Sequence, residues 1–142
     1  MTDAEIRHIL ETSKIVAIVG LSDKPDRDSY RVAEYLQSQG FRIIPVNPIV
    51  ASVLGERSYA SVADIPEQVD VVDIFRKPEA VGPVVDEASA AGARVIWMQL
   101  GVINHTAAEA ARAAGLAVVM DRCMKVEHQR LLNDSTERGS EE

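Results

Sequence analysis

Short runs of β-branched and other apolar residues alternate along the chain with longer segments of helical periodicity. Five runs have the length of strands, at residues 15–19, 42–46, 69–74, 94–98 and 116–120. Most of them are almost continuously apolar, which is typical of strands buried on both faces of a parallel sheet. Pro45 removes a hydrogen-bond donor from the second run, so we expect that strand to fray near its end.

The segments between these runs predict helices. Their ranges are 3–13, 29–39, 79–91, 106–114 and 123–131, with a short helical turn at 61–64. Three of the helices end at Gly40, Gly92 and Gly115, shortly before a strand begins, and Thr106 to Glu109 fits a capping box. The alternation predicts an α/β fold: a single Rossmann-like, doubly wound parallel sheet of about five strands in the order 3-2-1-4-5, with helices on both faces.

Length and charge narrow the class of protein. The 142 residues suit one domain, which we place at residues 1–132, followed by a polar tail at 133–142 that we expect to be disordered. The net charge is −7, of which the tail contributes −3. Without a basic excess a nucleic-acid surface is excluded, but a few focused cations can still bind a small anion.

Further compositional features exclude other classes. No apolar run approaches the roughly 18 residues of a membrane span, and the start of the chain does not resemble a signal peptide, so we expect a cytoplasmic protein without membrane contact. The single Cys123 and the scattered histidines argue against a disulfide and a metal site. We expect His105 and His128 at the surface and Cys123 as a small buried apolar residue.

The candidate site lies where the strands end, because doubly wound sheets bind ligands beyond the carboxyl ends of their strands. The first strand is followed by Gly20, which permits a sharp turn, and then by the start of a helix, whose N–H groups favour a phosphate. Ser22 and Arg27 can add hydrogen bonds to that phosphate, and we include Ser29 in the predicted binding segment. A solvated turn in which Asp28 or Ser29 caps the helix is the alternative interpretation.

The ends of the later strands carry further polar groups. Asn47-Pro48 stands where an NAD site needs an acidic residue, and the complete G-x-G-x-x-G pattern is absent, which argues against NAD. Arg76-Lys77, followed by Pro78, suits a phosphorylated ribose or merely an exposed surface. The fourth strand ends in Gln99 and Gly101. The chain has no G-x-S-x-G, no phosphate-binding G-x-x-x-x-G-K-[ST] and no convincing pair of carboxylates, so we predict that it is not an enzyme.

Six segments in a fixed order carry a resemblance to a known family, and none of them carries it alone. They are Val16–Ser22, Pro25–Ala33, Ile44–Pro48, Val71–Arg76, Val95–Gly101 and Val118–Cys123, and together they cover about residues 13–131. In their order and spacing they resemble the small CoA-binding proteins related to the CoA-binding domain of the succinyl-CoA synthetase α subunit.

This resemblance implies that the chain binds coenzyme A (CoA). It assigns the CoA diphosphate to Gly20, Ser22 and Arg27, the adenosine to Asn47 and Pro48, the cover of the nucleotide to Phe75, Arg76 and Pro78, and the pantetheine arm to Gln99 and Gly101. The synthetase's phosphorylated histidine belongs to a second domain that has no counterpart in this sequence. Its chemistry is therefore not carried over.

The residues and the resemblance together favour a non-catalytic module that binds CoA or acyl-CoA in a carrier, sensor or regulatory role. One alternative is a small NADP-dependent or thiol-redox enzyme that uses Cys123. Another is a partner-binding domain with a vestigial nucleotide site. The sequence leaves open which acyl group is preferred and whether the chain forms a homodimer.

Overall fold

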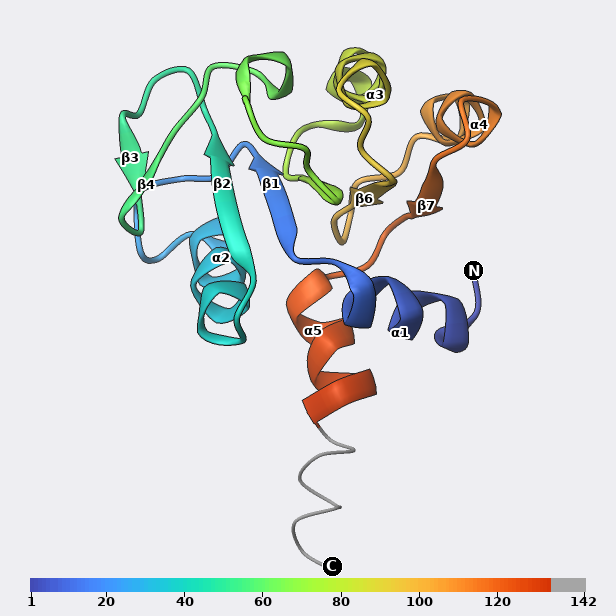
Figure 1. The fold of residues 1–142 in the computed structure, drawn as a ribbon, viewed down its shortest axis with the longest axis horizontal. Helices are drawn as coiled ribbons and strands as arrows, with labels where there is room; N and C mark the ends of the chain where they lie inside the picture. The colour runs from blue at the N-terminus through green and yellow to red at the C-terminus, as the bar shows by residue number, and fades with distance from the viewer. Residues whose placement is uncertain (134–142) are drawn as a thin grey trace, which may run out of the picture.

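A five-stranded parallel sheet forms the centre of the computed structural model, which describes residues 1–133 (Figure 1). Its strands are β1 (Ile15–Val19), β2 (Arg42–Val46), β5 (Val71–Ile74), β6 (Val95–Met98) and β7 (Ala117–Val119). The five predicted strands are confirmed, with ends shifted by two residues at most. The predicted tail, apart from its first residue, lies outside the described residues.

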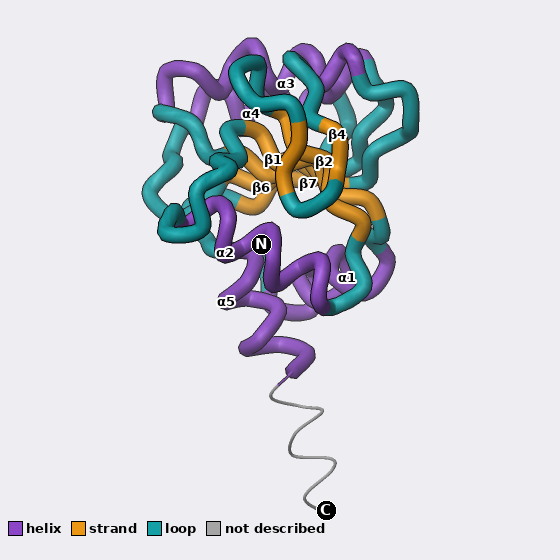
Figure 2. Tube along the Cα trace, turned by 90° about the vertical axis from the view of Figure 1, so that its left-hand side faces the viewer, coloured by secondary structure: helices purple, strands orange, loops and turns teal. Residues whose placement is uncertain are grey.

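Helices cover both faces of the sheet (Figures 1 and 2). One face carries α3 (Val81–Ala90) and α4 (His105–Ala113), and the other carries α1 (Asp3–Thr12), α2 (Asp28–Ser38) and α5 (Met124–His128), which continues into the π-helical segment η3 (Gln129–Asn133). Each face has its own hydrophobic core. Successive strand residues point to opposite faces, so Ala17 packs in the core beneath α3 and α4, and Val16 packs in the core beneath α1, α2 and α5. The predicted doubly wound α/β class is confirmed.

The boundaries of the helices follow local signals, with one correction. Gly40, Gly92 and Gly115 have φ angles of +95°, +78° and +90°, as expected of glycines that end helices. At the start of α4 the predicted capping box is wrong, because Asn104 is the capping residue and its Oδ1 accepts the N–H of Ala107 at 2.9 Å.

The order of the strands differs from the predicted 3-2-1-4-5. The sheet runs β2-β1-β5-β6-β7, which in chain order of the five strands is 2-1-3-4-5. The third strand, β5, therefore lies beside β1 and not outside β2. This moves the point at which the chain reverses its direction across the sheet to the gap between β1 and β5.

Pro45 supplies the physical reason for this order. Its carbonyl accepts the N–H of Tyr59 at 3.0 Å, on the side of β2 that faces away from β1. The N–H and C=O of a strand residue point the same way, so the donor that proline lacks would also face outward. A proline at this position is tolerated on an edge strand and would interrupt a ladder between two neighbours. β2 is accordingly placed at the edge.

The long connection after β2 contains elements that the sequence pattern did not reveal. β3 (Ser52–Val53) and β4 (Glu56–Arg57) form a small antiparallel hairpin whose turn residues, Leu54 and Gly55, both have positive φ angles. Residues after the hairpin cover part of the outer edge of β2 through a bridge between Val46 and Tyr59. The predicted helical turn is confirmed as η1 (Val62–Asp64), and η2 (Pro78–Ala80) precedes α3.

His128 is buried, and the prediction that it lies at the surface is wrong. Its Nδ1 is 2.7 Å from the hydroxyl of Tyr35, and its ring lies edge-on to the rings of Tyr35 and Phe41. These contacts join the end of α5 to α2. His105 is exposed at the start of α4, as expected.

Asp73 on β5 is a buried carboxyl group without a hydrogen-bond partner in the described part of the chain. It is fully buried, and its neighbours in register are Ile18 and Trp97. Burial penalises the charged form and raises the pKa of Asp73 well above its ordinary value. The carboxyl is therefore neutral in the folded protein over a range of pH in which it is ionised in the unfolded chain.

We expect Asp73→Asn to flatten the dependence of stability on pH. Because the folded pKa lies above the unfolded value of 3.8, stability is lost as the pH rises above about 4 toward the folded pKa. The free energy of unfolding of the wild type should fall by roughly 1.4 kcal/mol per pH unit in this window relative to the variant. Urea unfolding of both proteins at pH 5 and pH 8 measures this difference.

Asp70 provides the matched control for Asp73. Its Oδ2 accepts the N–H groups of Lys14 and Ile15, each at 2.9 Å, and its pKa is lowered although burial alone would raise it. Asp70→Asn should reduce stability at both pH values, with no added loss at pH 8. Parallel pH profiles for the wild type and Asp73→Asn would show that Asp73 is ionised in the folded state and contradict its assignment as neutral.

Candidate functional site

Gly20 marks the point where the chain leaves the sheet beside the end of β5. Its φ is +86°, and a Cβ atom at this position would lie 2.2 Å from the carbonyl oxygen of Phe75. Only glycine allows the two strand ends to approach so closely. Because β1 and β5 connect onward in opposite directions across the sheet, this is the position where doubly wound folds bind their ligands.

The loop after Gly20 folds back over the first turn of α2. The N–H of Ser22 donates to Oγ of Ser29 at 3.0 Å, and the N–H of Lys24 donates to Oγ of Ser22 at 3.1 Å. The loop and the strand end enclose a pocket of about 370 Å³, which we call the cradle. It is lined by Gly20, Ser22, Asp26, Arg27, Asp28, Ser29 and Phe75.

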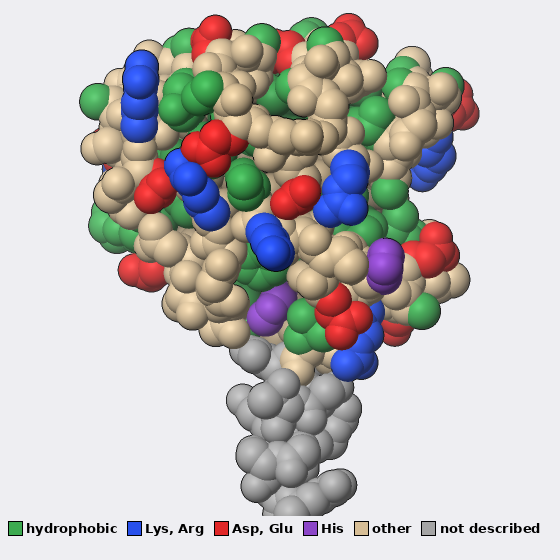
Figure 3. All heavy atoms as spheres, in the orientation of Figure 1, with side chains coloured by type: hydrophobic (Ala, Val, Ile, Leu, Met, Phe, Trp, Pro, Cys, Tyr) green, Lys and Arg blue, Asp and Glu red, His purple; other side chains and the backbone are tan. Residues whose placement is uncertain are grey.

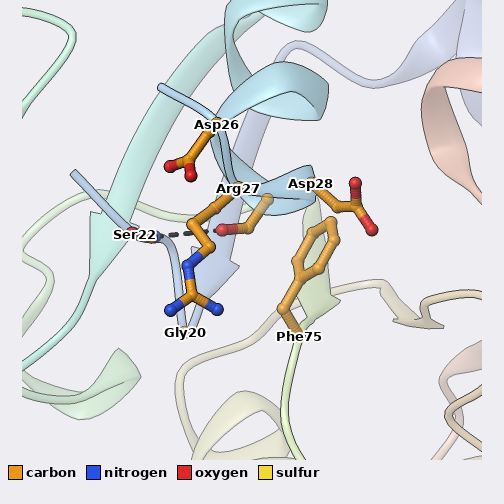
Figure 4. A pocket seen from close by; sticks show the side chains of 7 residues that line it. Gly20, Ser22, Asp26, Arg27, Asp28 and Phe75 are labelled. Carbon is orange, nitrogen blue, oxygen red and sulfur yellow. Dashed lines mark hydrogen bonds between the residues drawn. The ribbon is translucent and has the colours of Figure 1, made fainter. Parts of the chain in front are cut away.

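The cradle presents positive charge to its interior. Within the described part of the chain, the N–H groups of residues 28–30, in the first turn of α2, have no protein acceptor, and Arg27 forms no ion pair. Figure 4 shows the guanidinium of Arg27 directed toward Gly20, with the carboxylates of Asp26 and Asp28 turned away from it. Free N–H groups at a helix start and an unpaired guanidinium are the donors that bind phosphate.

A second cavity of about 530 Å³, which we call the side pocket, adjoins the cradle and shares Asp28 and Phe75 with it. Its floor includes Gln99, which follows β6 beside Phe75 and is 6% exposed. Its walls come from α2 and α5. The further lining residues are Arg31, Val32, Leu100, Cys123, Lys125, Val126 and Gln129.

The structure brings together about half of the site residues that we predicted. Gly20, Ser22, Arg27, Ser29 and Phe75 line the cradle, and Gln99 lines the side pocket. Arg76 lines a separate small cavity of about 120 Å³ next to Val19 and Val46. Pro48, Lys77, Pro78 and Gly101 line none of these three cavities.

Asn47 and Gly101 are predicted ligand residues that also already have partners in the protein. The side-chain amide of Asn47 donates to the carbonyl of Leu21 at 3.0 Å, and its Oδ1 accepts the N–H of Ile49 at 3.0 Å. The N–H of Gly101 donates to Oδ1 of Asp121 at 2.7 Å. In this structure Asn47 supports the loop after β1, and the N–H of Gly101 ties the end of β6 to the chain after β7.

Several residues of the side pocket were not predicted. Arg31, Lys125 and Gln129 lie on helices, where their spacing resembles that of any solvent-exposed helix face. Cys123 was expected to be buried but is half-exposed in the pocket wall. Their common position depends on the packing of α2 against α5, which no local pattern specifies.

A metal site needs a cluster of ligating side chains, and a membrane-spanning helix needs a long apolar stretch. Residues 1–133 contain no cluster of three or more side chains suited to a metal ion, and no helix there is both long and apolar enough to cross a bilayer. Basic and acidic side chains are interspersed over the face shown in Figure 3, without a broad basic field.

Comparison with known proteins assigns the family. Residues 14–129 match the family described as the CoA binding domain. The chain belongs to this family. It is 42% identical to the uncharacterized protein YneT of Bacillus subtilis over 125 residues, which make up 88% of this chain and 93% of YneT.

The chain is also similar to a solved structure and, over part of its length, to an enzyme. A hypothetical protein from Pyrococcus horikoshii superimposes on this CoA-binding domain with a TM-score of 0.91 and 45% identity, over 93% of each chain. The ADP-forming acetate–CoA ligase II of Archaeoglobus fulgidus is 32% identical over 81 residues, 56% of this chain and 12% of the ligase. The matched segment therefore makes up about an eighth of that enzyme's length.

We expect Gly20→Ala to destabilise the protein more than the same change at Gly55. Both glycines have positive φ angles, but a Cβ at Gly55 meets no atom within 4 Å, whereas one at Gly20 meets the carbonyl of Phe75. Gly55→Ala should cost about 1–2 kcal/mol for the backbone conformation alone. Gly20→Ala should exceed this cost in urea unfolding. Equal losses would contradict the close approach of the two strand ends.

Proposed function

We propose that this chain binds coenzyme A or an acyl-CoA as a non-catalytic module, with the CoA diphosphate in the cradle. The observation that carries the proposal is the unpaired guanidinium of Arg27 beside the free N–H groups of α2, at the reversal point of the sheet, in a CoA-binding domain. The first turn of α2 and Arg27 would share the negative charge of the diphosphate.

The two arms of CoA would leave the cradle in opposite directions. The side pocket adjoins the cradle and contains Gln99, so it suits the pantetheine arm with its amide groups. The adenosine would extend past the ends of β1 and β2, toward Asn47 and Pro48, with Phe75 and Pro78 beside the nucleotide. Arg76 and Lys77 carry no ion pair with a described residue and would bind its ribose phosphate.

A carrier, sensor or regulatory role is supported by the side chains that line the cradle and the side pocket. The described lining residues offer backbone N–H groups, amides, cations and apolar surface, which bind and orient a ligand. The hydroxyls of Ser22 and Ser29 accept backbone N–H groups of the loop, and the carboxylates of Asp26 and Asp28 are turned away from Arg27. Cys123 is the lining residue with a nucleophilic thiol, and no lining histidine lies beside it to act as a base. The ligand would therefore leave chemically unchanged.

Titration calorimetry with CoA, acetyl-CoA, NADP and NAD tests the proposal. We expect both CoA species to bind and Arg27→Gln to weaken each by about tenfold, the size of one charge-assisted hydrogen bond. ADP, which retains the diphosphate, should show the same dependence on Arg27. Arg112→Gln, which removes an equal charge from the opposite face of the sheet, is the control and should change neither affinity.

Two results would overturn this function. Indifference to CoA and acetyl-CoA would favour a partner-binding domain, and preferential binding of NADP with hydride transfer would favour the redox enzyme. Urea unfolding of Arg27→Gln separates a binding defect from a folding defect. Because Arg27 is exposed and forms no ion pair with a described residue, the free energy of unfolding should remain that of the wild type.

A further inference from the structure

The side pocket contains two cations to which the proposed position of the CoA diphosphate assigns no role. Arg31 lies on α2 and Lys125 on α5, so two separate elements place positive charge in one cavity. Neither side chain forms an ion pair or hydrogen bond with another described residue. Lys125 contacts the ring of Tyr35, with its Nζ 5.7 Å from the ring centroid.

The position of these cations separates them from the phosphate cradle. Arg31 follows Arg27 by four residues, which places its Cα roughly 6 Å further along α2. Asp28 lies at the boundary that the two cavities share, whereas Arg31 and Lys125 line the side pocket alone. The cavities thus offer two regions of positive charge with an acidic residue between them.

In an acyl-CoA whose acyl group ends in an anion, a pantetheine arm and methylene groups connect the diphosphate to that anion. The remaining walls of the side pocket suit these connecting groups. The Oε1 of Gln99 accepts the N–H of Met124 at 3.5 Å, so its Nε2, together with the amide of Gln129, can pair with the amides of a pantetheine arm. Leu100 and Val126 are 67% and 51% exposed and offer apolar surface to the methylene groups of an acyl chain. An anion at the far end of this path would meet Arg31 and Lys125.

We propose that the side pocket favours acyl-CoA thioesters whose acyl group ends in a carboxylate, which Arg31 and Lys125 bind together. The proposal rests on the proposed function, because it places the diphosphate in the cradle and the pantetheine arm in the side pocket. A guanidinium can bind a carboxylate through two parallel hydrogen bonds, and the ammonium adds a further donor. A neutral acyl group of the same length leaves both cations without a partner.

Matched pairs of thioesters test this preference. Succinyl-CoA and butyryl-CoA have four-carbon acyl groups, and glutaryl-CoA and pentanoyl-CoA have five, so each pair differs in the terminal carboxylate. Calorimetry with the wild type should show tighter binding of the carboxylate partner by about tenfold in at least one pair. Raising the ionic strength to 0.5 M should reduce the preference, since the cations are close to solvent.

The double variant Arg31→Gln, Lys125→Gln should abolish the preference and leave the affinity for butyryl-CoA and pentanoyl-CoA unchanged. The matched control is Lys14→Gln, Arg112→Gln, which removes the same charge from exposed positions outside both cavities and should retain the preference. Both variants should unfold at the urea concentration of the wild type.

Three other outcomes would overturn the carboxylate preference, and they show whether the proposed CoA binding fails with it. Equal affinity for the two members of both pairs, with CoA still bound, rejects the carboxylate and leaves the proposed function intact. Failure to bind any CoA species rejects both. If the double variant weakens CoA and every thioester alike but not dephospho-CoA, the two cations hold the 3′-phosphate and the ligand runs in the reverse direction.

Discussion

The close approach of Gly20 to the end of β5 is the constraint on which the candidate site depends. The N–H of Gly20 donates to the carbonyl of Val46 at 2.9 Å, and the N–H of Phe75 donates to the carbonyl of Val19 at 2.8 Å. The ends of β2, β1 and β5 are thereby held at one point. Since a side chain on Gly20 would displace Phe75, the turn into the loop, the start of α2 and the ring beside the cradle all follow from this contact.

The place of that contact in the sheet follows from Pro45. A proline whose missing donor faces outward keeps β2 at the edge, which puts β5 beside β1 and the reversal of the chain between them. The predicted order would have put the reversal beside β6 and made Gln99 the neighbour of Gly20. In the observed order Phe75 occupies that place, and Gln99 lies one strand further, in the side pocket.

β5, the central strand of the sheet, ends beside the cradle and also carries Asp73, whose burial lowers the stability of the fold when the carboxyl is ionised. Asp73 points to the same face of the sheet as Phe75, which directly follows β5, but it is buried between Ile18 and Trp97. A buried carboxyl without a partner is tolerated in its neutral form, at the cost of stability when the pH favours ionisation. Its neighbour Asp70 shows the contrast, because two backbone N–H groups and Arg94 favour its charged form.

The sequence by itself determined the features that depend on neighbours along the chain. Strand positions, the helix ends at Gly40, Gly92 and Gly115, and the loop from Gly20 to Arg27 that supplies one side of the cradle all follow from apolar periodicity, glycine conformation and the free N–H groups of a helix start. These are local properties, so they could be read without knowing the rest of the molecule.

Only the tertiary structure decided the strand order, the burial of His128 and the composition of the side pocket. Pro45 carried a signal for the order, but interpreting it required knowing which side of β2 is paired. His128 is buried because it meets Tyr35 and Phe41, which are distant in sequence. Arg31 and Lys125 share a cavity because α2 and α5 pack on the same face of the sheet, and hydrophobic packing fixes such contacts between elements without leaving a local pattern.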